Sequence, residues 1–241
     1  LAEKGDADAQ YELGVMYMNG FVVSQDYHEA MKWYRKAADQ GHVHAQTDIG
    51  IMYGHGLGVS QKYEEAMKWF HKAAAQNDAV AQFSIGTMYR EGYGVQRDYT
   101  EALKWFRRAA DQGLAAAQSD IGTMYADGYG VPQDYAEAVK WYRKAAEQGF
   151  AIGQYNLALA LEYGRGVPQD YKEAAKWYLL AARQGHSGAQ NNIGLMYSNG
   201  RGVAGDPKEA VKWFKMAADQ GHVIAQFNIG TMYDDGKGVP Q

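Results

Sequence analysis

Residues 9–41 read AQYELGVMYMNGFVVSQDYHEAMKWYRKAADQG and contain the pattern that decides the fold. The pair Ala9-Gln10 returns every 36 residues, with no insertion or deletion between copies. The later copies are Ala45-Gln46, Ala81-Gln82, Ala117-Gln118, Gly153-Gln154, Ala189-Gln190 and Ala225-Gln226. A fixed period of this length is typical of proteins in which each repeat packs on its neighbours. We therefore interpret residues 1–241 as one repeat array, with partial repeats at 1–8 and 225–241. The six full repeats start at residues 9, 45, 81, 117, 153 and 189.

The first half of each repeat is predicted to be a helix. In residues 9–17, apolar or small side chains recur at i, i+4, i+7 and i+8, which places them on one helical face. A glycine then ends the pattern, because glycine accepts the left-handed conformation common at helix C-termini. These glycines are Gly20, Gly56, Gly92, Gly128, Gly164 and Gly200. A glycine inside the helix costs about 1 kcal/mol relative to alanine, so we expect a close helix–helix crossing there. Its copies are Gly14, Gly50, Gly86, Gly122, Gly194 and Gly230, with Ala158 in the fifth repeat.

The second half of each repeat is predicted to be a helix as well. It starts with an Asp followed three residues later by a Glu, an arrangement that resembles a capping box. The pairs are Asp26/Glu29, Asp98/Glu101, Asp134/Glu137, Asp170/Glu173 and Asp206/Glu209. Lys62 breaks the pattern, so the second repeat should have the weakest start to its second helix. Each helix carries one tryptophan, which we expect to fill space between helix pairs. It ends at Gly41 and its copies, with Asn77 in the second repeat.

These motifs carry a family resemblance. The pattern Ala-Gln-x-x-Leu/Ile-Gly-x-Met-Tyr, then Gly-x-Gly-Val-x-Gln-Asp-Tyr-x-Glu-Ala-x-Lys-Trp-Tyr/Phe, then Ala-Ala-x-Gln-Gly resembles the Sel-1-like repeat, a relative of the tetratricopeptide repeat. The resemblance implies an all-α, right-handed superhelical solenoid of 36-residue helix–loop–helix repeats, with the first helix of each repeat on the inner surface. It also implies a non-catalytic scaffold or adaptor that binds a protein or peptide, with a bacterial periplasmic, secreted or host-directed setting favoured.

Composition excludes several classes of site. The formal net charge of −4 gives no basic field for a nucleic acid partner, and the absence of cysteine excludes disulfides and thiolate chemistry. No apolar run is long enough for direct membrane insertion, and residues 1–20 lack the features of a signal peptide. Since residues 1–5 match the end of a repeat helix, we allow for an N-terminal leader segment that has been removed.

Each candidate motif for catalysis, cofactor binding or metal binding lacks a required residue or the required structural context. The Gly200–Gly205 segment satisfies G-x-G-x-x-G, but it joins two predicted helices rather than a strand and a helix. His28-Glu29 begins like a zincin motif, yet Lys32 takes the place of the second histidine. No serine has a lysine three residues later, as a β-lactamase-like site would need. We therefore predict no catalytic, cofactor-binding or metal-binding residues, and we interpret His42 and His44 as solvated surface.

A partner is expected to contact positions that vary between copies, since invariant positions are explained by packing. By analogy with tetratricopeptide repeats, these are the positions of Tyr11, Val15, Met18 and Asn19. At the first of them, aromatic and small polar residues alternate along the array. The aromatic members are Tyr11, Phe83, Tyr155 and Phe227. They predict pockets for apolar side chains of a peptide or helix, or else they pack on the adjacent helix.

Charge gives a second expectation. Acidic residues gather on the first helices and basic residues on the second helices. The second-helix acids, from Glu29 to Glu209, each precede a lysine by three residues, whereas the first-helix acids have no such lysine. The pattern predicts an acidic inner groove for a basic or amphipathic partner. The candidate residues beyond the aromatic series are Glu91, Asp120, Asp127 and Tyr163.

Three alternatives stay open. The array is a spacer or a rod that associates end to end through unfinished terminal repeats, an enzyme with an unfamiliar site, or a helical repeat that binds RNA. The first-helix acids oppose the RNA reading, because they would repel phosphate.

Overall fold

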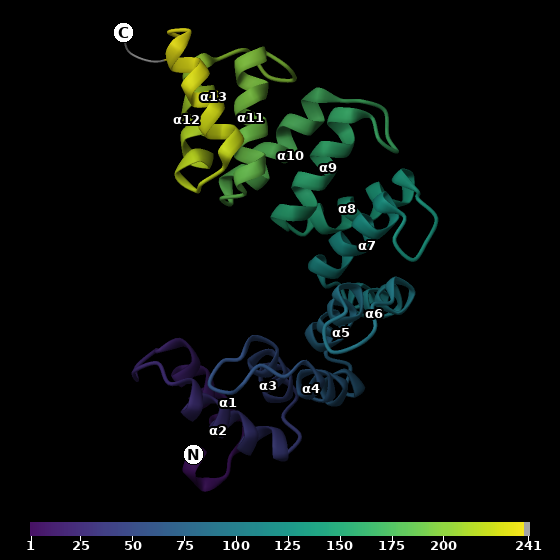
Figure 1. Ribbon diagram of the computed structural model, residues 1–241, viewed down its shortest axis with the longest axis vertical. Helices are drawn as coiled ribbons and strands as arrows, with labels where there is room; N and C mark the ends of the chain where they lie inside the picture. The colour runs from purple at the N-terminus through teal and green to yellow at the C-terminus, as the bar shows by residue number, and fades with distance from the viewer. Residues whose placement is uncertain (239–241) are drawn as a thin grey trace. The chain divides into compact units, whose positions relative to one another are not determined.

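The computed structural model describes residues 1–238, and within them it contains one 3₁₀ helix, thirteen α-helices and no strand (Figure 1). The chain divides into two compact units, Leu1–Leu114 and a second that begins at Ala115. The first unit contains the 3₁₀ helix Ala2–Lys4, α1 (Ala7–Asn19), α2 (Tyr27–Asp39), α3 (Val43–His55), α4 (Tyr63–Ala75), α5 (Ala79–Glu91) and α6 (Tyr99–Asp111). The second contains α7 (Ala115–Asp127), α8 (Tyr135–Glu147), α9 (Ala151–Tyr163), α10 (Tyr171–Arg183), α11 (Ser187–Asn199), α12 (Pro207–Asp219) and α13 (Val223–Asp234).

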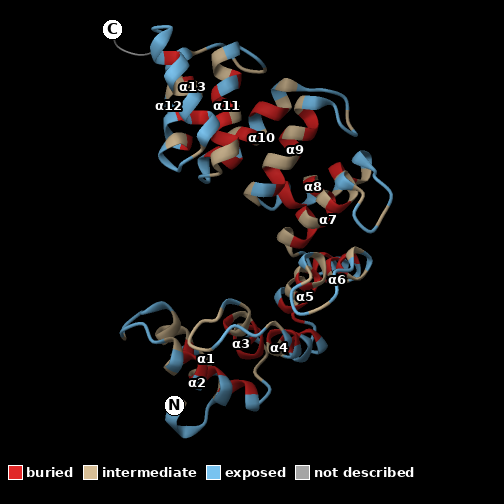
Figure 2. Ribbon diagram, viewed as in Figure 1, coloured by how far each residue is buried: buried red, intermediate tan, exposed pale blue. Residues whose placement is uncertain are grey.

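Odd-numbered helices are the first helices of the repeats, and even-numbered helices are the second. Within each unit, every helix packs on the next one along the chain, so that helix pairs stack as a solenoid. Buried residues lie on both helices of each pair (Figure 2). The predicted all-α fold of helix–loop–helix repeats is therefore confirmed.

The glycine inside each first helix makes room for an aromatic ring of the second helix. A Cβ atom built on Gly50 would lie 2.6 Å from Cδ1 of Phe70, and one on Gly86 would lie 2.6 Å from Cδ1 of Phe106. Both rings are buried, and the ring that follows the tryptophan is buried in every full repeat. At the expected close crossing, an aromatic ring of the second helix therefore packs directly against the backbone of the first helix.

The invariant glutamine of the Ala-Gln pair links the two helices of each repeat. Gln40 donates from Nε2 to Oε1 of Gln10 at 2.8 Å, across thirty residues of sequence. The same bond joins Gln76 to Gln46, Gln112 to Gln82, Gln148 to Gln118, Gln184 to Gln154 and Gln220 to Gln190. A buried amide needs such partners, and this explains why glutamine recurs in every copy.

Helix ends follow the sequence predictions. The glycines after α1, α3, α5, α9 and α11 have φ between 62° and 78°, and Asn77 has φ 65°. Asp26, Asp98, Asp134, Asp170 and Asp206 accept backbone N–H bonds at the starts of their helices, whereas Lys62 makes no side-chain cap. The capping Asp is therefore confirmed. Glu29 and Glu101 pair with lysines three residues later, at 2.9 and 2.8 Å.

The tryptophans pack between neighbouring helix pairs, as expected: Trp69 packs against the core formed by α2 and α3, and Trp105 against the core formed by α4 and α5. Trp69, Trp105, Trp141 and Trp177 are half-buried, and the residue after each is buried. Several tryptophans lie under a cation of the same helix: Lys36 Nζ is 3.9 Å from the Trp33 ring centroid, and Lys72 Nζ is 3.9 Å from that of Trp69. These contacts place the tryptophans at the edge of the core.

Candidate functional site

The predicted aromatic series is half-buried at three of its four positions. The ring centroid of Tyr11 lies 5.7 Å from that of Tyr34, and Phe83 lies 5.4 Å from Phe106. Tyr155 lies 5.9 Å from Tyr178 in the same way. Each ring therefore covers the buried ring of its own repeat and leaves part of its surface available. Phe227 is different, because 73% of its surface is exposed on α13.

Histidines contribute to these surfaces, which the sequence interpretation missed. His42 accepts the Ala45 N–H at Nδ1, so it caps α3, and its ring stacks on Tyr11 at 4.4 Å. His186 caps α11 and stacks on Tyr155 at the same distance. His44 pairs with Asp78 at 3.4 Å. Burial lowers the pKa of His42 and of His186, which favours the neutral ring that a cap requires. Solvated surface was the wrong interpretation for His42, which caps α3.

The candidate acids differ in their surroundings. Glu91 accepts a bond from Nε of Arg90 at 2.7 Å, so its charge is partly compensated. Asp127 is exposed at the end of α7, and Asp120 is half-buried on the same helix. Tyr163 is 58% exposed at the end of α9, with the Arg165 guanidinium 5.4 Å from its ring centroid. Glu91 thus has a partner other than a helix-spaced lysine.

Asp48 forms a cluster with two tyrosines that the sequence did not indicate. Burial raises the pKa of the Asp48 carboxyl to about 6, although the neighbouring hydroxyl groups of Tyr11 and Tyr34 oppose that rise. Burial and the nearby Asp48 carboxylate raise the pKa of Tyr11 to about 12. At neutral pH the cluster therefore holds a carboxylate that is costly to keep charged.

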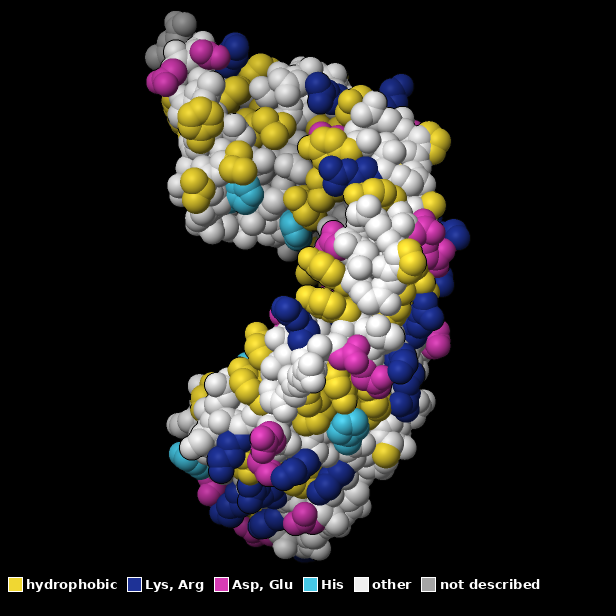
Figure 3. Space-filling model, turned by 45° about the vertical axis from the view of Figure 1, so that its right-hand side comes forward, with side chains coloured by type: hydrophobic (Ala, Val, Ile, Leu, Met, Phe, Trp, Pro, Cys, Tyr) yellow, Lys and Arg dark blue, Asp and Glu magenta, His cyan; other side chains and the backbone are white. Residues whose placement is uncertain are grey.

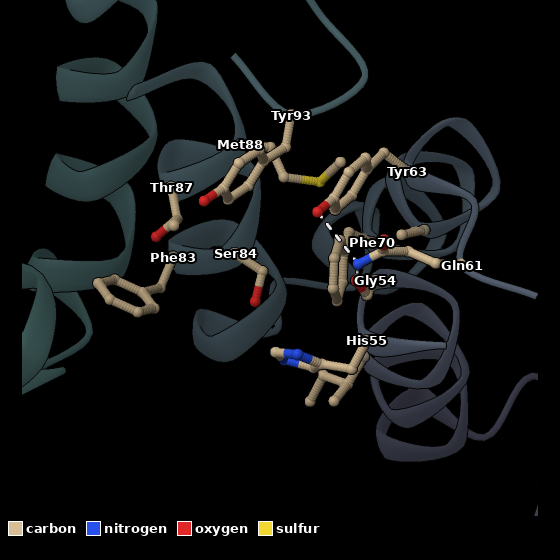
Figure 4. Close-up of a pocket in the computed structure, with 12 residues that line it drawn as sticks. Gly54, His55, Gln61, Tyr63, Phe70, Phe83, Ser84, Thr87, Met88 and Tyr93 are labelled. Carbon is tan, nitrogen blue, oxygen red and sulfur yellow. Dashed lines mark hydrogen bonds between the residues drawn. The ribbon is translucent and has the colours of Figure 1, made fainter. Parts of the chain in front are cut away.

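A pocket of about 360 Å³ lies between α3, α4 and α5 in the first unit (Figure 4). Phe70, Phe83 and Met88 contribute apolar surface, and Tyr63 and Tyr93 stack at 4.9 Å with their rings 7° apart. The other lining residues are Ile51, Gly54, His55, Gln61, Ala66, Ser84 and Thr87. Among the predicted residues, Phe83 belongs to this pocket, and its partners come from two other helices and two loops.

Gly54 explains why the pocket occurs in this repeat. A Cβ atom at Gly54 would meet only the Cβ atom of Ala66, at 3.9 Å. The equivalent position in the first repeat is Met18, which packs against the core, and in the third it is Arg90, whose guanidinium lies 5.5 Å from the Phe106 ring centroid. In the fifth repeat Glu162 accepts a bond from the Tyr178 hydroxyl at 2.6 Å. A large side chain at this position covers the buried ring, and glycine leaves it accessible.

The fourth repeat supports this explanation. Its equivalent residue is Ala126, and a second pocket of about 150 Å³ lies beside it in the second unit. That pocket includes Asp127 and Arg165, so it is more polar than the pocket beside Gly54. The sequence contained a signal for these pockets, because the residue at the position of Met18 varies between copies. The informative property of that residue was the size of its side chain, not its aromatic character.

On the N-terminal part of the molecule, Lys and Arg side chains are interspersed with Asp and Glu (Figure 3). Over residues 1–238, no group of three or more His, Asp or Glu side chains is arranged to hold a metal ion. No helix in that range combines the length and the apolar character that crossing a bilayer requires.

Two of the similar solved structures are of bacterial proteins. A protective antigen from uropathogenic Escherichia coli, c5321, is 40% identical with a TM-score of 0.86; the match covers 98% of this chain and 50% of the antigen. This chain thus spans about half the length of the antigen. A Sel1 repeat protein from Oxalobacter formigenes is 41% identical with a TM-score of 0.86, over 90% of this chain and 89% of that protein. No curated protein sequence matches the chain.

The family comparison covers nearly the whole chain. The model of the Sel1 repeat matches seven times, at residues 7–42, 43–78, 79–114, 115–150, 151–186, 187–222 and 223–241. The matches are contiguous, as expected from the uninterrupted 36-residue period. Because repeated family matches, high structural similarity and 40% identity agree, this chain belongs to the Sel1 repeat family.

Proposed function

We propose that this protein binds a segment of a partner protein on the surface of its odd-numbered helices and catalyses no reaction. Sel1 repeat proteins are commonly protein-interaction scaffolds. The observation that carries the proposal is the pocket beside Gly54, where residues from three consecutive helices line one cavity of about 360 Å³. Concave apolar sites of this size are typical of binding surfaces.

The candidate residues support this proposal to different degrees. Phe83 lines the pocket, whereas Tyr11 and Tyr155 cover buried rings and contribute to stability as well. Tyr163 and Phe227 are exposed and free to contact a partner. Glu91 is paired with Arg90, so its charge is partly compensated. The two similar solved proteins are bacterial, which supports a bacterial periplasmic, secreted or host-directed role within the proposal.

Site-specific photo-crosslinking tests which helices bind. His55 and Tyr163 end α3 and α9 at equivalent positions, and both are exposed. Lys68 and Lys176 occupy equivalent exposed positions on α4 and α10. A photoreactive residue at either member of the first pair should crosslink a protein from extracts of the source organism, and one at the second pair should not. Crosslinking from the second pair only would overturn the proposal, and no crosslink from any position would favour the spacer alternative.

The charge preference has a separate test. Neutralising Glu91, Asp120 and Asp127 together should weaken binding of a basic partner, with the larger loss at low ionic strength because salt screens exposed charges. The affinity of the crosslinked partner would be measured at two salt concentrations. Unchanged affinity at low salt would contradict an acidic contribution.

A further inference from the structure

We infer that the pocket beside Gly54 anchors one neutral aromatic side chain of the partner protein. This inference rests on the proposed function and names the chemical group that is bound. It follows from the charge of the lining, the rings that form it, and the residue that keeps it open.

The lining selects against a charged group. The twelve residues described as lining the pocket include no Lys, Arg, Asp or Glu. A charged side chain that entered it would lose hydration without gaining an ion pair, and this is costly in an apolar environment. A neutral side chain has no such penalty, so the occupant is uncharged.

The rings of the pocket favour an aromatic occupant over an aliphatic one. Phe70 is buried with 5% of its surface exposed, and the rings of Phe83, Tyr63 and Tyr93 also line the pocket (Figure 4). Aromatic pairs contribute about 0.5–1.5 kcal/mol beyond the area that they bury. The Met88 thioether adds a favourable sulfur–aromatic contact. The cavity of about 360 Å³ lies in the size range of sites that enclose small organic groups.

The wall of the pocket is held in place before a partner binds. Gln61 donates from Nε2 to the Gly54 carbonyl at 2.7 Å and to the Tyr63 hydroxyl at 3.1 Å. Tyr63 in turn stacks on Tyr93. His55 and Gln61 are exposed, and Tyr93 is 44% exposed, so one side of the pocket reaches the surface. A prearranged wall lowers the entropy lost when a side chain is bound.

Gly54 provides a matched pair of variants. Gly54→Met introduces the residue that the first repeat carries at Met18, and it should fill the pocket without introducing a charge. Gly54→Ala adds a single methyl group that would lie 3.9 Å from the Cβ atom of Ala66, an ordinary van der Waals contact, so it should leave the pocket open. Both changes replace glycine in a helix, and both should therefore retain the fold.

Side-chain analogues test the site without knowledge of the partner. Toluene and p-cresol represent neutral aromatic side chains, n-butylammonium represents lysine and acetate represents aspartate. Titration of the full chain would be followed by the methyl NMR resonances of Ile51 and Met88, both of which line the pocket. Toluene or p-cresol should shift these resonances in the wild type and in Gly54→Ala. The shifts should be lost in Gly54→Met, and the charged analogues should leave the wild type unchanged.

The outcomes separate this inference from the proposed function. Equal shifts in Gly54→Met, no shift in the wild type, or stronger shifts with n-butylammonium would overturn the aromatic anchor. Circular dichroism of both variants checks that they are folded. If a crosslinked partner binds Gly54→Met as tightly as Gly54→Ala, the protein-binding function stands and the anchor does not. If the analogues bind as expected but no partner is crosslinked, the pocket stands and the proposed function fails.

Discussion

Gln112 donates a side-chain hydrogen bond to Gln82 at 2.8 Å and so joins α6 to α5. Gln82 is fully buried and donates its own amide to Oδ1 of Asn77 at 3.1 Å. Each repeat therefore closes its helix pair with a glutamine pair whose members lie thirty residues apart. The bond belongs to the tertiary structure, although the repeated glutamine is visible in the sequence.

Gln82→Leu should lower the free energy of unfolding by about 1–3 kcal/mol, because it leaves the Gln112 amide without its acceptor in a partly buried place. Urea denaturation would measure the loss. Gln96 is exposed in a loop, and Gln96→Leu is the matched control, expected within about 0.5 kcal/mol of the wild type. Equal stability of the two variants would show that the glutamine pair is dispensable.

Two equivalent glycines should respond in opposite directions to alanine. A Cβ atom on Gly86 would lie 2.6 Å from the Phe106 ring, so Gly86→Ala should destabilise the protein by about 1–3 kcal/mol. Gly230 has nothing within 4 Å of the same position, so Gly230→Ala should be neutral or stabilising by up to about 1 kcal/mol. Thermal unfolding would compare them. Destabilisation by both would point to backbone conformation rather than the ring.

The uncapped start of α4 offers a stabilising substitution. Lys62 makes no side-chain cap, whereas Asp98 accepts the Glu101 N–H at the same position of the next repeat. Lys62→Asp should raise the free energy of unfolding by about 1 kcal/mol. Lys62→Ala removes the charge without adding a cap and serves as the control. If both variants gain equally in a denaturant titration, charge rather than capping is responsible.

Thr87 has a buried hydroxyl oxygen with no hydrogen-bond partner in the structure. At the equivalent place in the fourth repeat, the Tyr142 hydroxyl lies 3.3 Å from Oγ1 of Thr123. Phe106→Tyr supplies the missing hydroxyl and should stabilise the protein by about 0.5–1.5 kcal/mol. The double variant with Thr87→Val should lose this gain, as a double-mutant cycle would show. An unchanged gain in the double variant would exclude the hydrogen bond as its cause.

Asp48 should make stability depend on pH. Its folded pKa of about 6 exceeds the ordinary value of 3.8, so the folded state binds more protons between those values, and stability falls as pH rises through them. Asp48→Asn removes this dependence. Relative to the wild type it should gain up to about 3 kcal/mol between pH 4 and pH 7. Comparing the two proteins cancels the opposing titration of His42 and His186.

The sixth repeat provides the control for Asp48→Asn. Asn192 occupies the position equivalent to Asp48 and neighbours Tyr155 and Tyr178. An asparagine is therefore compatible with two tyrosines in this arrangement. Asn192→Asp should introduce the pH dependence that Asp48→Asn removes. A stability difference that stays constant from pH 4 to pH 7 would contradict the burial of the Asp48 charge.

The sequence by itself determined the repeat, the two helices of each copy and most of their ends. Those features depend on local chemistry, such as a left-handed glycine at Gly20 or a backbone-capping carboxylate at Asp26, and local chemistry is readable from neighbouring residues. Lys62 was identified as an exception for the same reason. Comparison of the copies also showed that Gly14 and its equivalents needed a structural explanation.

Only the tertiary structure decided which side chains meet. The sequence marked the tryptophans, but the rings after them occupy the space above the glycines, because the direction of a side chain depends on how two helices pack. His42 caps α3 through a contact within its own segment, but its stacking on Tyr11 depends on the packing of neighbouring helices. The pocket beside Gly54 arises from a missing side chain above a ring that a different helix supplies. A sequence records each residue but not the space left between residues of separate helices, and that space holds the candidate site.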